Sequence, residues 1–232
     1  MKKALLFLFL FASSLASGQT SKFRFGLALN AGRTDNIQSN DGSVPNVVSN
    51  AYKDLEQRSI GYSGQIFTQY STSSKFKLQV GMGYVRTEYA TEIKELVFAQ
   101  PEPNMPRYSK FEYSHQDLML PIQARYNFSV KKNTFYVLGG ISPLFKLKRS
   151  KTNTLWYADG SISSKTDDDS VTDYRTLNFN GSFGIGYDLK VAKKMNVFFQ
   201  PTFDCNLLGA SKSASLNRRV YSVGLSVGFI YG

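Results

Sequence analysis

Apolar residues recur at every second position along most of this 232-residue chain, and small polar residues occupy the positions between them. In the stretch 176–190, for example, Phe183, Ile185 and Tyr187 alternate with Gly184 and Gly186. Because a β-strand places successive side chains on opposite faces, a period of two is typical of strands whose faces contact different environments. The pattern predicts an all-β protein.

The alternating runs are long. Each run reaches the ~9–11 residues that a tilted strand needs to cross a bilayer, whereas strands of soluble proteins average ~5–6 residues. We identify about eight runs, at 22–32, 59–71, 75–89, 111–128, 134–148, 176–190, 195–207 and 219–231. Their length therefore favours strands that span a membrane.

The composition of the two faces indicates how such strands are arranged. The polar face is rich in Gly, Ser, Asn and Gln, as expected for side chains that must fit inside a narrow barrel. Large aromatic residues lie near both ends of the apolar face, as in the interfacial girdles of outer-membrane barrels. Lipid offers no hydrogen-bond partner to a sheet edge, so the last run must pair with the first. We predict a closed antiparallel transmembrane β-barrel of about eight strands, whose interior is filled by side chains.

Connections between the runs alternate in length. Short turns lie at 71–74, 130–133 and 191–194, and longer polar loops lie at 33–58, 90–110, 149–175 and 208–218. This asymmetry is typical of outer-membrane barrels and predicts short periplasmic turns and long extracellular loops. We expect the long loops to be mobile, and both termini to lie on the periplasmic side.

The first 18 residues have the features of a secretory signal peptide. Lys2 and Lys3 precede an apolar stretch at 4–16, and small residues at 16–18 form a cleavage site. The apolar stretch is shorter than the ~18 residues expected of a spanning helix. We therefore expect a signal peptide at 1–18, one barrel domain at 19–232, and export to the outer membrane.

Composition excludes several functional classes. One cysteine, Cys205, permits no intramolecular disulfide, and one histidine, His115, makes Cys- or His-based metal centres improbable. We predict no cofactor and no metal site. The net charge is +11, but dispersed charges and the export signal argue against nucleic acid as a partner.

Charged residues on the inward face need partners, because a buried unpaired charge is costly. By strand parity, the bases expected to point inward are Arg24, Lys77, Arg125, Lys146 and Lys148, and the acids are Asp117, Asp188 and Asp204. We predict that these residues form an interior charge network that blocks open diffusion through the barrel.

His115 is the candidate for a catalytic role, since it lies between Ser114 and Asp117. A histidine base with a serine nucleophile could hydrolyse lipid acyl chains. Neighbouring residues of a strand point to opposite faces, however, so Ser114 and His115 are poorly placed to act together. We therefore predict that the protein is not an enzyme, and keep an outer-membrane lipid hydrolase as an alternative.

Two loop features could bind ligands. An acidic group, comprising Asp167, Asp168, Asp169 and Asp173, could attract calcium, although a solvated acidic loop is the favoured reading. Trp156 and Tyr157 are either a recognition tip or an interfacial anchor.

Basic residues near the extracellular strand ends could hold lipopolysaccharide phosphates through charge-assisted hydrogen bonds: Lys146, Lys148, Arg149 and Lys151, with Arg218 and Arg219 expected across from them.

Five stretches have a recognisable sequence: GYSGQIFTQYSTSSKFKLQVGMGYVRTE at 61–88, DLMLPIQARY at 117–126, FYVLGGISPLFKL at 135–147, FNGSFGIGYDL at 179–189 and NRRVYSVGLSVGFIY at 217–231. Together they resemble the PorT-like outer-membrane β-barrel proteins of Bacteroidetes. The resemblance covers nearly the whole mature chain and includes a mid-strand proline, Pro121. It implies an outer-membrane location and contact with the barrel assembly machinery, which reads a terminal aromatic residue; this sequence departs from that pattern, because Tyr231 is penultimate and Gly232 is last. It fixes no activity, although some members serve a secretion and gliding apparatus.

Three functional hypotheses follow. The first is a non-enzymatic structural or interaction barrel in contact with lipid and lipopolysaccharide, for which membership of a secretion or envelope complex is one option. The second is the lipid hydrolase, and the third is a soluble secreted barrel that carries an apolar ligand. The direction in which the apolar side chains face distinguishes the third hypothesis from the others.

Overall fold

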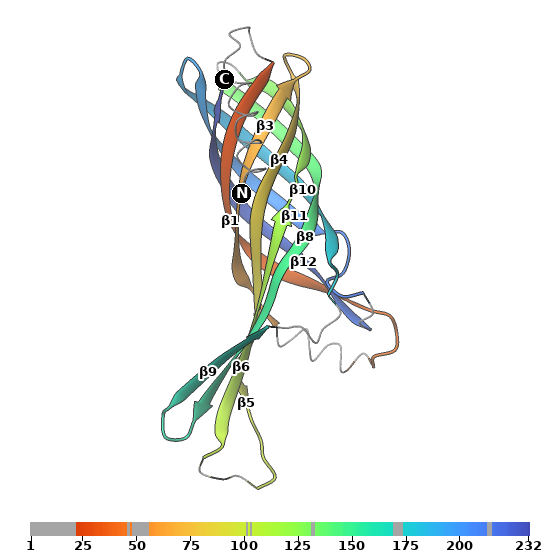
Figure 1. The fold of residues 1–232 in the computed structure, drawn as a ribbon, viewed down its shortest axis with the longest axis vertical. Helices are drawn as coiled ribbons and strands as arrows, with labels where there is room; N and C mark the ends of the chain where they lie inside the picture. The colour runs from red at the N-terminus through yellow and green to blue at the C-terminus, as the bar shows by residue number, and fades with distance from the viewer. Residues whose placement is uncertain are drawn as a thin grey trace, which may run out of the picture.

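The structure is a computed structural model that describes residues 22–45, 47, 56–100, 102, 104–130, 133–168, 174–212 and 215–232. The expected signal peptide at 1–18 lies outside the described residues. The described residues form one antiparallel sheet of twelve strands (Figure 1). The strands are Phe23–Asn40 (β1), Glu56–Gln57 (β2), Ser59–Ser71 (β3), Phe76–Thr91 (β4), Lys94–Glu95 (β5), Pro106–Met119 (β6), Ile122–Val130 (β7), Asn133–Tyr157 (β8), Ile162–Asp168 (β9), Leu177–Ala192 (β10), Met195–Asn206 (β11) and Leu216–Tyr231 (β12).

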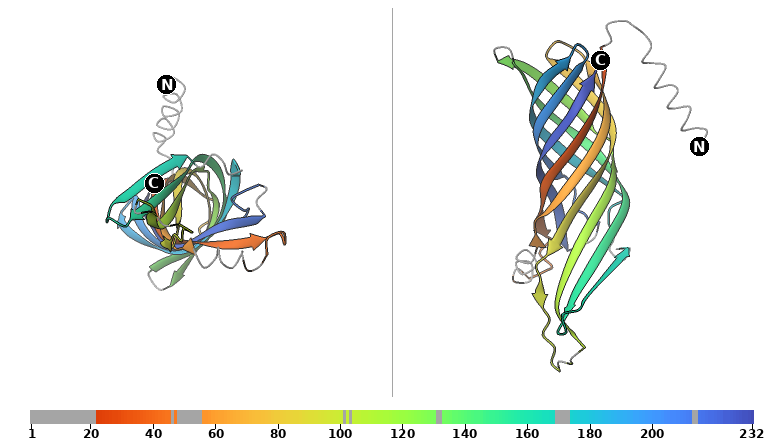
Figure 2. Two further views of the ribbon diagram at one scale, coloured as in Figure 1. Left: turned by 90° about the horizontal axis from the view of Figure 1, so that it is seen from below. Right: turned by 90° about the vertical axis from the view of Figure 1, so that its left-hand side faces the viewer.

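The long strands are hydrogen-bonded to neighbours on both sides. β1 pairs with β12 and β3, β3 pairs with β4, and β4 pairs with both β6 and β7. β8 pairs with β6, β7 and β10, and β10 leads through β11 back to β12. The pairings thus return to their start, and the strands surround a common axis (Figure 2). We call this arrangement the ring. No described stretch forms a helix with the length and apolarity that a membrane crossing requires.

The structure has twelve strands where the sequence predicted about eight. One reason is that the predicted run 111–128 is interrupted at Leu120 and Pro121, because proline has no N–H to donate to the ladder. The path continues across this break, since Leu120 donates to Pro143 O and Gly81 donates to Pro121 O, both at 3.0 Å. The other reason is that the short strands β2, β5 and β9 lie within the predicted loops.

The predicted loop at 149–175 is largely strand in its described part, and the loop at 90–110 contains strand at 90–91, 94–95 and 106–110. β6 begins at Pro106, and β8 extends to Tyr157 before the chain turns into β9. Together with β5, these segments form an antiparallel sheet that projects far beyond the ring (Figures 1 and 2). We call this projection, formed by 94–111 and 152–168, the arm. Long cross-strand pairing, with polar contacts such as Thr152 Oγ1 to Thr166 Oγ1 at 2.8 Å, replaces the expected mobile loop.

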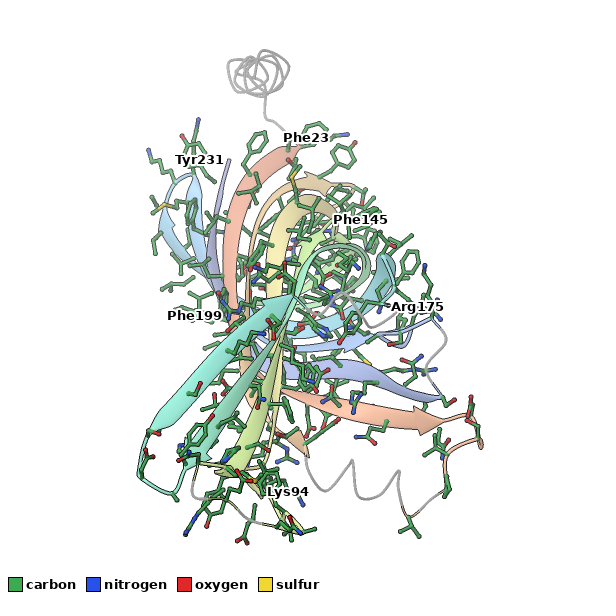
Figure 3. All side chains as sticks on the ribbon, turned by 60° about the horizontal axis from the view of Figure 1, so that its bottom comes forward. Phe23, Lys94, Phe145, Arg175, Phe199 and Tyr231 are labelled. Atoms are coloured by element: carbon green, nitrogen blue, oxygen red, sulfur yellow. The ribbon has the colours of Figure 1, made fainter. Side chains whose placement is uncertain are left out.

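Short connections gather at the opposite end of the ring. β3 and β4 are joined by 72–75, and β10 and β11 by 193–194. Phe23 and Tyr231 lie at this end too, as Figure 3 shows by their labels, and Lys94 lies at the far end of the arm. We call the two ends of the ring the short-turn end and the long-loop end. Short and long connections are therefore segregated, as the sequence predicted.

Large apolar side chains face away from the axis of the ring. The exposed fraction is 57% for Val80, 52% for Phe183 and 48% for Leu225. The opposite parity of the same strands carries buried polar residues such as Gln79 and Ser226. A soluble barrel would show the reverse arrangement, because water cannot favourably solvate a continuous apolar exterior.

Aromatic pairs mark both edges of this apolar surface. Phe23 and Tyr70 lie 4.9 Å apart between ring centroids near the short-turn end, and Tyr62 and Tyr84 lie 6.5 Å apart nearer the long-loop end. Beyond the second edge, outward positions become charged. We call the surface between the edges the apolar belt; it covers 23–31, 60–70, 76–84, 118–128, 135–145, 177–191, 195–205 and 221–231.

The interior is filled partly by aromatic side chains that pack against glycine. The buried apolar cluster comprises Ala28, Phe67, Tyr136, Leu138, Phe198 and Ile230. A Cβ atom at Gly186 would lie 2.1 Å from Tyr136 Cζ, and one at Gly26 would lie 2.2 Å from Phe67 Cζ. The inward glycines therefore provide the space that these rings occupy, which explains the small residues on the polar face of the sequence.

Replacing one of these glycines tests the packing. We expect Gly186→Ala to destabilise the folded state by about 1–3 kcal/mol, because Tyr136 must leave its position. Gly139→Ala is the matched control, since its Cβ would meet no atom closer than 3.8 Å. Urea unfolding of the refolded variants measures both. Equal stability of Gly186→Ala and wild type would contradict the packing.

Candidate functional site

The interior of the ring near the long-loop end is filled by a cluster of aromatic rings. Tyr89 stacks on Tyr113 at 4.6 Å between centroids, and His115 contacts Tyr89 at 5.5 Å and Tyr174 at 5.2 Å. Tyr89, His115 and Tyr174 are at most 7% exposed. We call these four residues the aromatic plug. Tyr174 comes from the connection before β10, where it forms a bridge with Ser211, so a loop residue completes the plug.

An ion pair lies directly below the aromatic plug. Arg149 Nη2 is 2.6 Å from Asp117 Oδ1, and the side chains are only 10% and 8% exposed. Arg149 also donates to Gln116 O at 3.0 Å. The pair satisfies a carboxylate that would otherwise be buried without a partner.

The expectation that Lys148 points inward is wrong, because it lies 3.4 Å from Asp168 in a solvated pair. Lys146 is exposed but lies opposite the buried Asp117 in the ladder, on the inward side as expected. The change at Lys148 follows from a register shift: Asp117 pairs with Lys146 and Gln116 with Lys148, so β8 holds one extra residue at this point. A bulge of this kind reverses the parity that follows it, which brings Arg149 to the interior.

A second charged layer lies toward the short-turn end. Arg125 is 1% exposed and forms an ion pair with Asp188, whose side chain is 5% exposed. The guanidinium lies 3.4 Å from the centroid of the Tyr136 ring, and its Nε donates to Asn127 at 2.8 Å. The structure thus brings together two residues of the predicted network, Arg125 and Asp188, and encloses them.

A polar cavity of about 80 Å³ lies between the two charged layers. Asp204 lines it, and its carboxylate accepts from Asn180 at 3.1 Å rather than from a basic residue. Since a water molecule takes up ~30 Å³ in the liquid, the cavity holds only a few waters. The predicted base for Asp204 is therefore replaced by an amide, and the interior offers no wide path along its axis.

The other two members of the predicted network, Arg24 and Lys77, line a larger cavity that opens at the short-turn end. Neither is in an ion pair with a described residue. The predicted set of inward charges is thus divided into a layer at Arg125, a layer at Arg149 and an open basic mouth.

His115 and Ser114 do not form a catalytic pair in this structure. His115 lies in the aromatic plug, and Ser114 faces the other way along β6; neither His115 Nε2 nor Ser114 Oγ has a hydrogen-bond partner among the described residues. His115 lies outside the apolar belt, and burial, with Arg149 and Arg218 nearby, lowers its pKa to about 3. A buried imidazole that resists protonation and lies away from the serine is suited to packing.

The residues predicted to bind lipopolysaccharide phosphate do not form one patch. β8 pairs with β6, β7, β9 and β10, whereas β12 pairs with β1 and β11, so their basic residues are not across from each other. Arg149 is interior, and Arg218 forms a part-buried ion pair with Glu56. Lys151 lies 4.3 Å from the centroid of the Phe111 ring on the arm. Lys146, Lys148 and Arg219 stay exposed.

Acidic loop residues form solvated pairs. Asp167 lies 3.1 Å from Lys165, and both side chains are more than half exposed; Asp169 and Asp173 lie outside the described residues. Within the described ranges, no group of three or more His, Cys, Asp or Glu side chains could hold a metal ion.

Tyr89 and Tyr174 are structural residues that the sequence reading missed. Tyr89 is the last residue of the predicted run 75–89 and has the same parity as Lys77, so applying that parity to the end of the run would have placed it inside. Tyr174 lies outside any strand, and no periodic signal could have located it.

Comparison with known families identifies the class of protein. Residues 11–208 match the family model described as outer membrane protein beta-barrel domain. The match covers most of the chain, so the chain belongs to this family, and its location is the outer membrane. The predictions of an all-β antiparallel fold and an outer-membrane protein are confirmed at this level. A comparison with curated proteins finds no match.

Solved outer-membrane proteins are similar over nearly the whole chain. Neisserial surface protein A is 15% identical, with 91% of this chain and 97% of that chain covered and a TM-score of 0.39. OprG of Pseudomonas aeruginosa is 11% identical, with coverages of 90% and 94% and a TM-score of 0.44. The outer membrane protease OmpT of Escherichia coli is 8% identical, with coverages of 90% and 96% and a TM-score of 0.42.

Removing one partner of the interior pair tests its role. We expect Arg149→Met to lower the free energy of unfolding by about 3–5 kcal/mol, because Asp117 then stays buried without a partner. Lys148→Met is the matched control on the same strand, and its exposed pair should contribute less than about 1 kcal/mol. Urea titration of the refolded proteins gives both values. Similar losses in the two variants would show that Arg149 is not an interior residue.

Proposed function

We propose that this protein is an integral, closed, eight-stranded barrel of the outer membrane, with a non-enzymatic structural or interaction role. In this proposal β6 and β7 act as one spanning path and, with β1, β3, β4, β8, β10, β11 and β12, complete the barrel. The short-turn end faces the periplasm, and the arm extends outside the cell. The pairing of β8 with β10 and of β12 with β1 supports closure.

The apolar belt carries the proposal. Its side chains are exposed on every long strand and end in aromatic residues at both edges, which matches the hydrocarbon layer and its two interfaces. Outside the second edge, Arg86 and Glu88 form an ion pair at 2.5 Å with about a third of each side chain exposed. Charged outward residues begin where the polar lipid headgroups should begin.

The interior supports a role other than transport or hydrolysis. The aromatic plug, the pair Arg149–Asp117 and the pair Arg125–Asp188 occupy successive levels of the lumen. Ser114 and His115 point to opposite faces of β6, which supports a non-enzyme over a lipid hydrolase. Both features leave the two ends of the barrel as the surfaces that contact other molecules.

The arm supports an interaction role. β9 is exposed along its whole length and is paired only with β8 among the described strands. The arm holds this strand and its charged residues Lys165 and Asp167 far from the membrane in an ordered sheet. An exposed ordered surface of this kind suits contact with an envelope partner, and the PorT-like resemblance suggests that the partner belongs to a secretion or envelope complex.

The position of the belt is tested by Leu225→Arg. We expect a loss of about 2–4 kcal/mol in folding stability in lipid vesicles, because the guanidinium would enter hydrocarbon. Val97→Arg is the control, since Val97 is 91% exposed but lies outside the belt. If both variants fold equally well, the outward apolar surface does not contact lipid.

The interaction role is tested by shortening the arm. Replacing 155–163 by Asn-Gly joins Thr154 to Ser164 through a tight turn and should leave the barrel intact. We expect the shortened chain to show normal heat-modifiable migration on gels. A partner protein that crosslinks to the full chain in native membranes should no longer crosslink to the shortened chain. If the shortened chain crosslinks to the same partners as the full chain, the arm is not the interaction surface.

A further inference from the structure

The short-turn end carries an excess of positive charge. The described basic residues at this end are Lys22, Arg24, Lys75, Lys77, Lys190, Lys193 and Lys194. The described side-chain carboxylate at this end is Asp188, which is already paired with Arg125. Almost all other described acidic residues lie toward the long-loop end or on the arm, where they are mixed with basic residues. The short-turn end therefore differs from the other end by its uncompensated positive charge.

A cavity of about 580 Å³ opens among these basic residues. Arg24, Lys75, Lys77 and Lys190 line it, together with Asn196 and the carboxylate of Asp188. We call it the basic mouth. It lies below the Arg125 layer, so it is accessible from the short-turn end and separated from the inner cavity. Its size is sufficient for a phosphate group with attached atoms.

Lys77 is the feature that distinguishes the basic mouth from a solvated basic surface. The residue is 9% exposed and lines the cavity, so its stem is buried while its ammonium reaches the open space. No described residue forms a hydrogen bond or ion pair with it, and Asp188, the carboxylate that lines the cavity, is engaged by Arg125. An ammonium held in a partly enclosed cavity without a carboxylate of its own favours an anion there.

We propose that the basic mouth binds a phosphate group. Lys77 contacts it at the inner wall, and Arg24 contributes a planar guanidinium of the kind that suits two phosphate oxygens. Lys75 and Lys190 lie nearer the opening and attract the anion by their charge. The carboxylate of Asp188 does not cancel the positive charge of the basic mouth, because it is neutralised by its own partner, Arg125. The phosphate comes either from the headgroup of an inner-leaflet phospholipid or from a soluble phosphate-bearing molecule.

Inorganic phosphate is the probe in the first experiment. The refolded full chain in a non-ionic maltoside detergent is titrated by calorimetry, alongside Lys77→Met and Lys77→Arg. We expect saturable binding that weakens roughly tenfold or more in Lys77→Met and is largely retained in Lys77→Arg. Lys165→Met is the matched control on the arm, 78% exposed, and should bind as wild type does.

Heat-modifiable migration on gels establishes that each variant is folded, and Lys77→Met should fold readily because methionine keeps the apolar stem of the lysine. If Lys77→Met proves unfolded, Arg24→Gln replaces it in the same titration with the same expected loss. Absence of saturable phosphate binding by wild type, or equal binding by the folded variants, would overturn the proposal.

The source of the phosphate is distinguished in nanodiscs. If a lipid headgroup occupies the basic mouth, nanodiscs containing phosphatidylglycerol should abolish the binding of inorganic phosphate that phosphatidylcholine nanodiscs allow. If the natural ligand is soluble, binding should be equal in both. This second experiment rests on the proposed orientation in the membrane, whereas the detergent titration does not, so failure of one is separable from failure of the other.

Discussion

The hydrogen bonding of the backbone is the constraint on which the rest of this structure depends. In hydrocarbon, an unpaired N–H or C=O group costs several kcal/mol, so every strand within the apolar belt must have two neighbours. The chain meets this requirement by pairing β12 with β1 over the range from Phe25 to Asn40 and β8 with β10 from Thr134 to Phe145. At Pro121, where one donor is missing, β4 pairs with both β6 and β7 and bridges the gap.

Once the strands surround an axis, most of the interior must be filled by side chains, and its buried charges need partners. The structure achieves this in levels, with a small polar cavity between two of them. Small residues such as Gly186 make room for large rings such as Tyr136, and each buried base in the two inner layers contacts a carboxylate. These levels separate the short-turn end from the long-loop end.

Much of the fold could be predicted from the sequence because its main signal is local. Alternation with a period of two shows directly where the strands lie and which side chains point outward. It holds within the apolar belt, for example at Val80 and Leu225. The segregation of short and long connections could also be predicted, since it depends only on the spacing of the runs.

The parts that could not be predicted depend on contacts between distant residues. The bulge at 146–148 has no glycine or proline to mark it, yet it exchanges Lys148 for Arg149 as the interior base. The arm is formed by polar segments whose pairing stabilises them only after β6 and β8 are aligned. Tyr174 joins the aromatic plug from a loop, where parity has no meaning. Several individual residues of the interior, such as Arg125 and Asp188, could therefore be predicted from the sequence. The division of the interior charges into two enclosed layers and an open basic mouth could not.

The central claim is that the outward apolar side chains contact acyl chains. Single-tryptophan variants measure this directly, with Trp156 replaced by Phe and one tryptophan placed at Phe183 or Leu225. In vesicles of lipids brominated on their acyl chains, we expect strong quenching of fluorescence at both belt positions. The native Trp156, which lies on the arm, should be unaffected. Unquenched, water-accessible tryptophan at positions 183 and 225 would contradict the account.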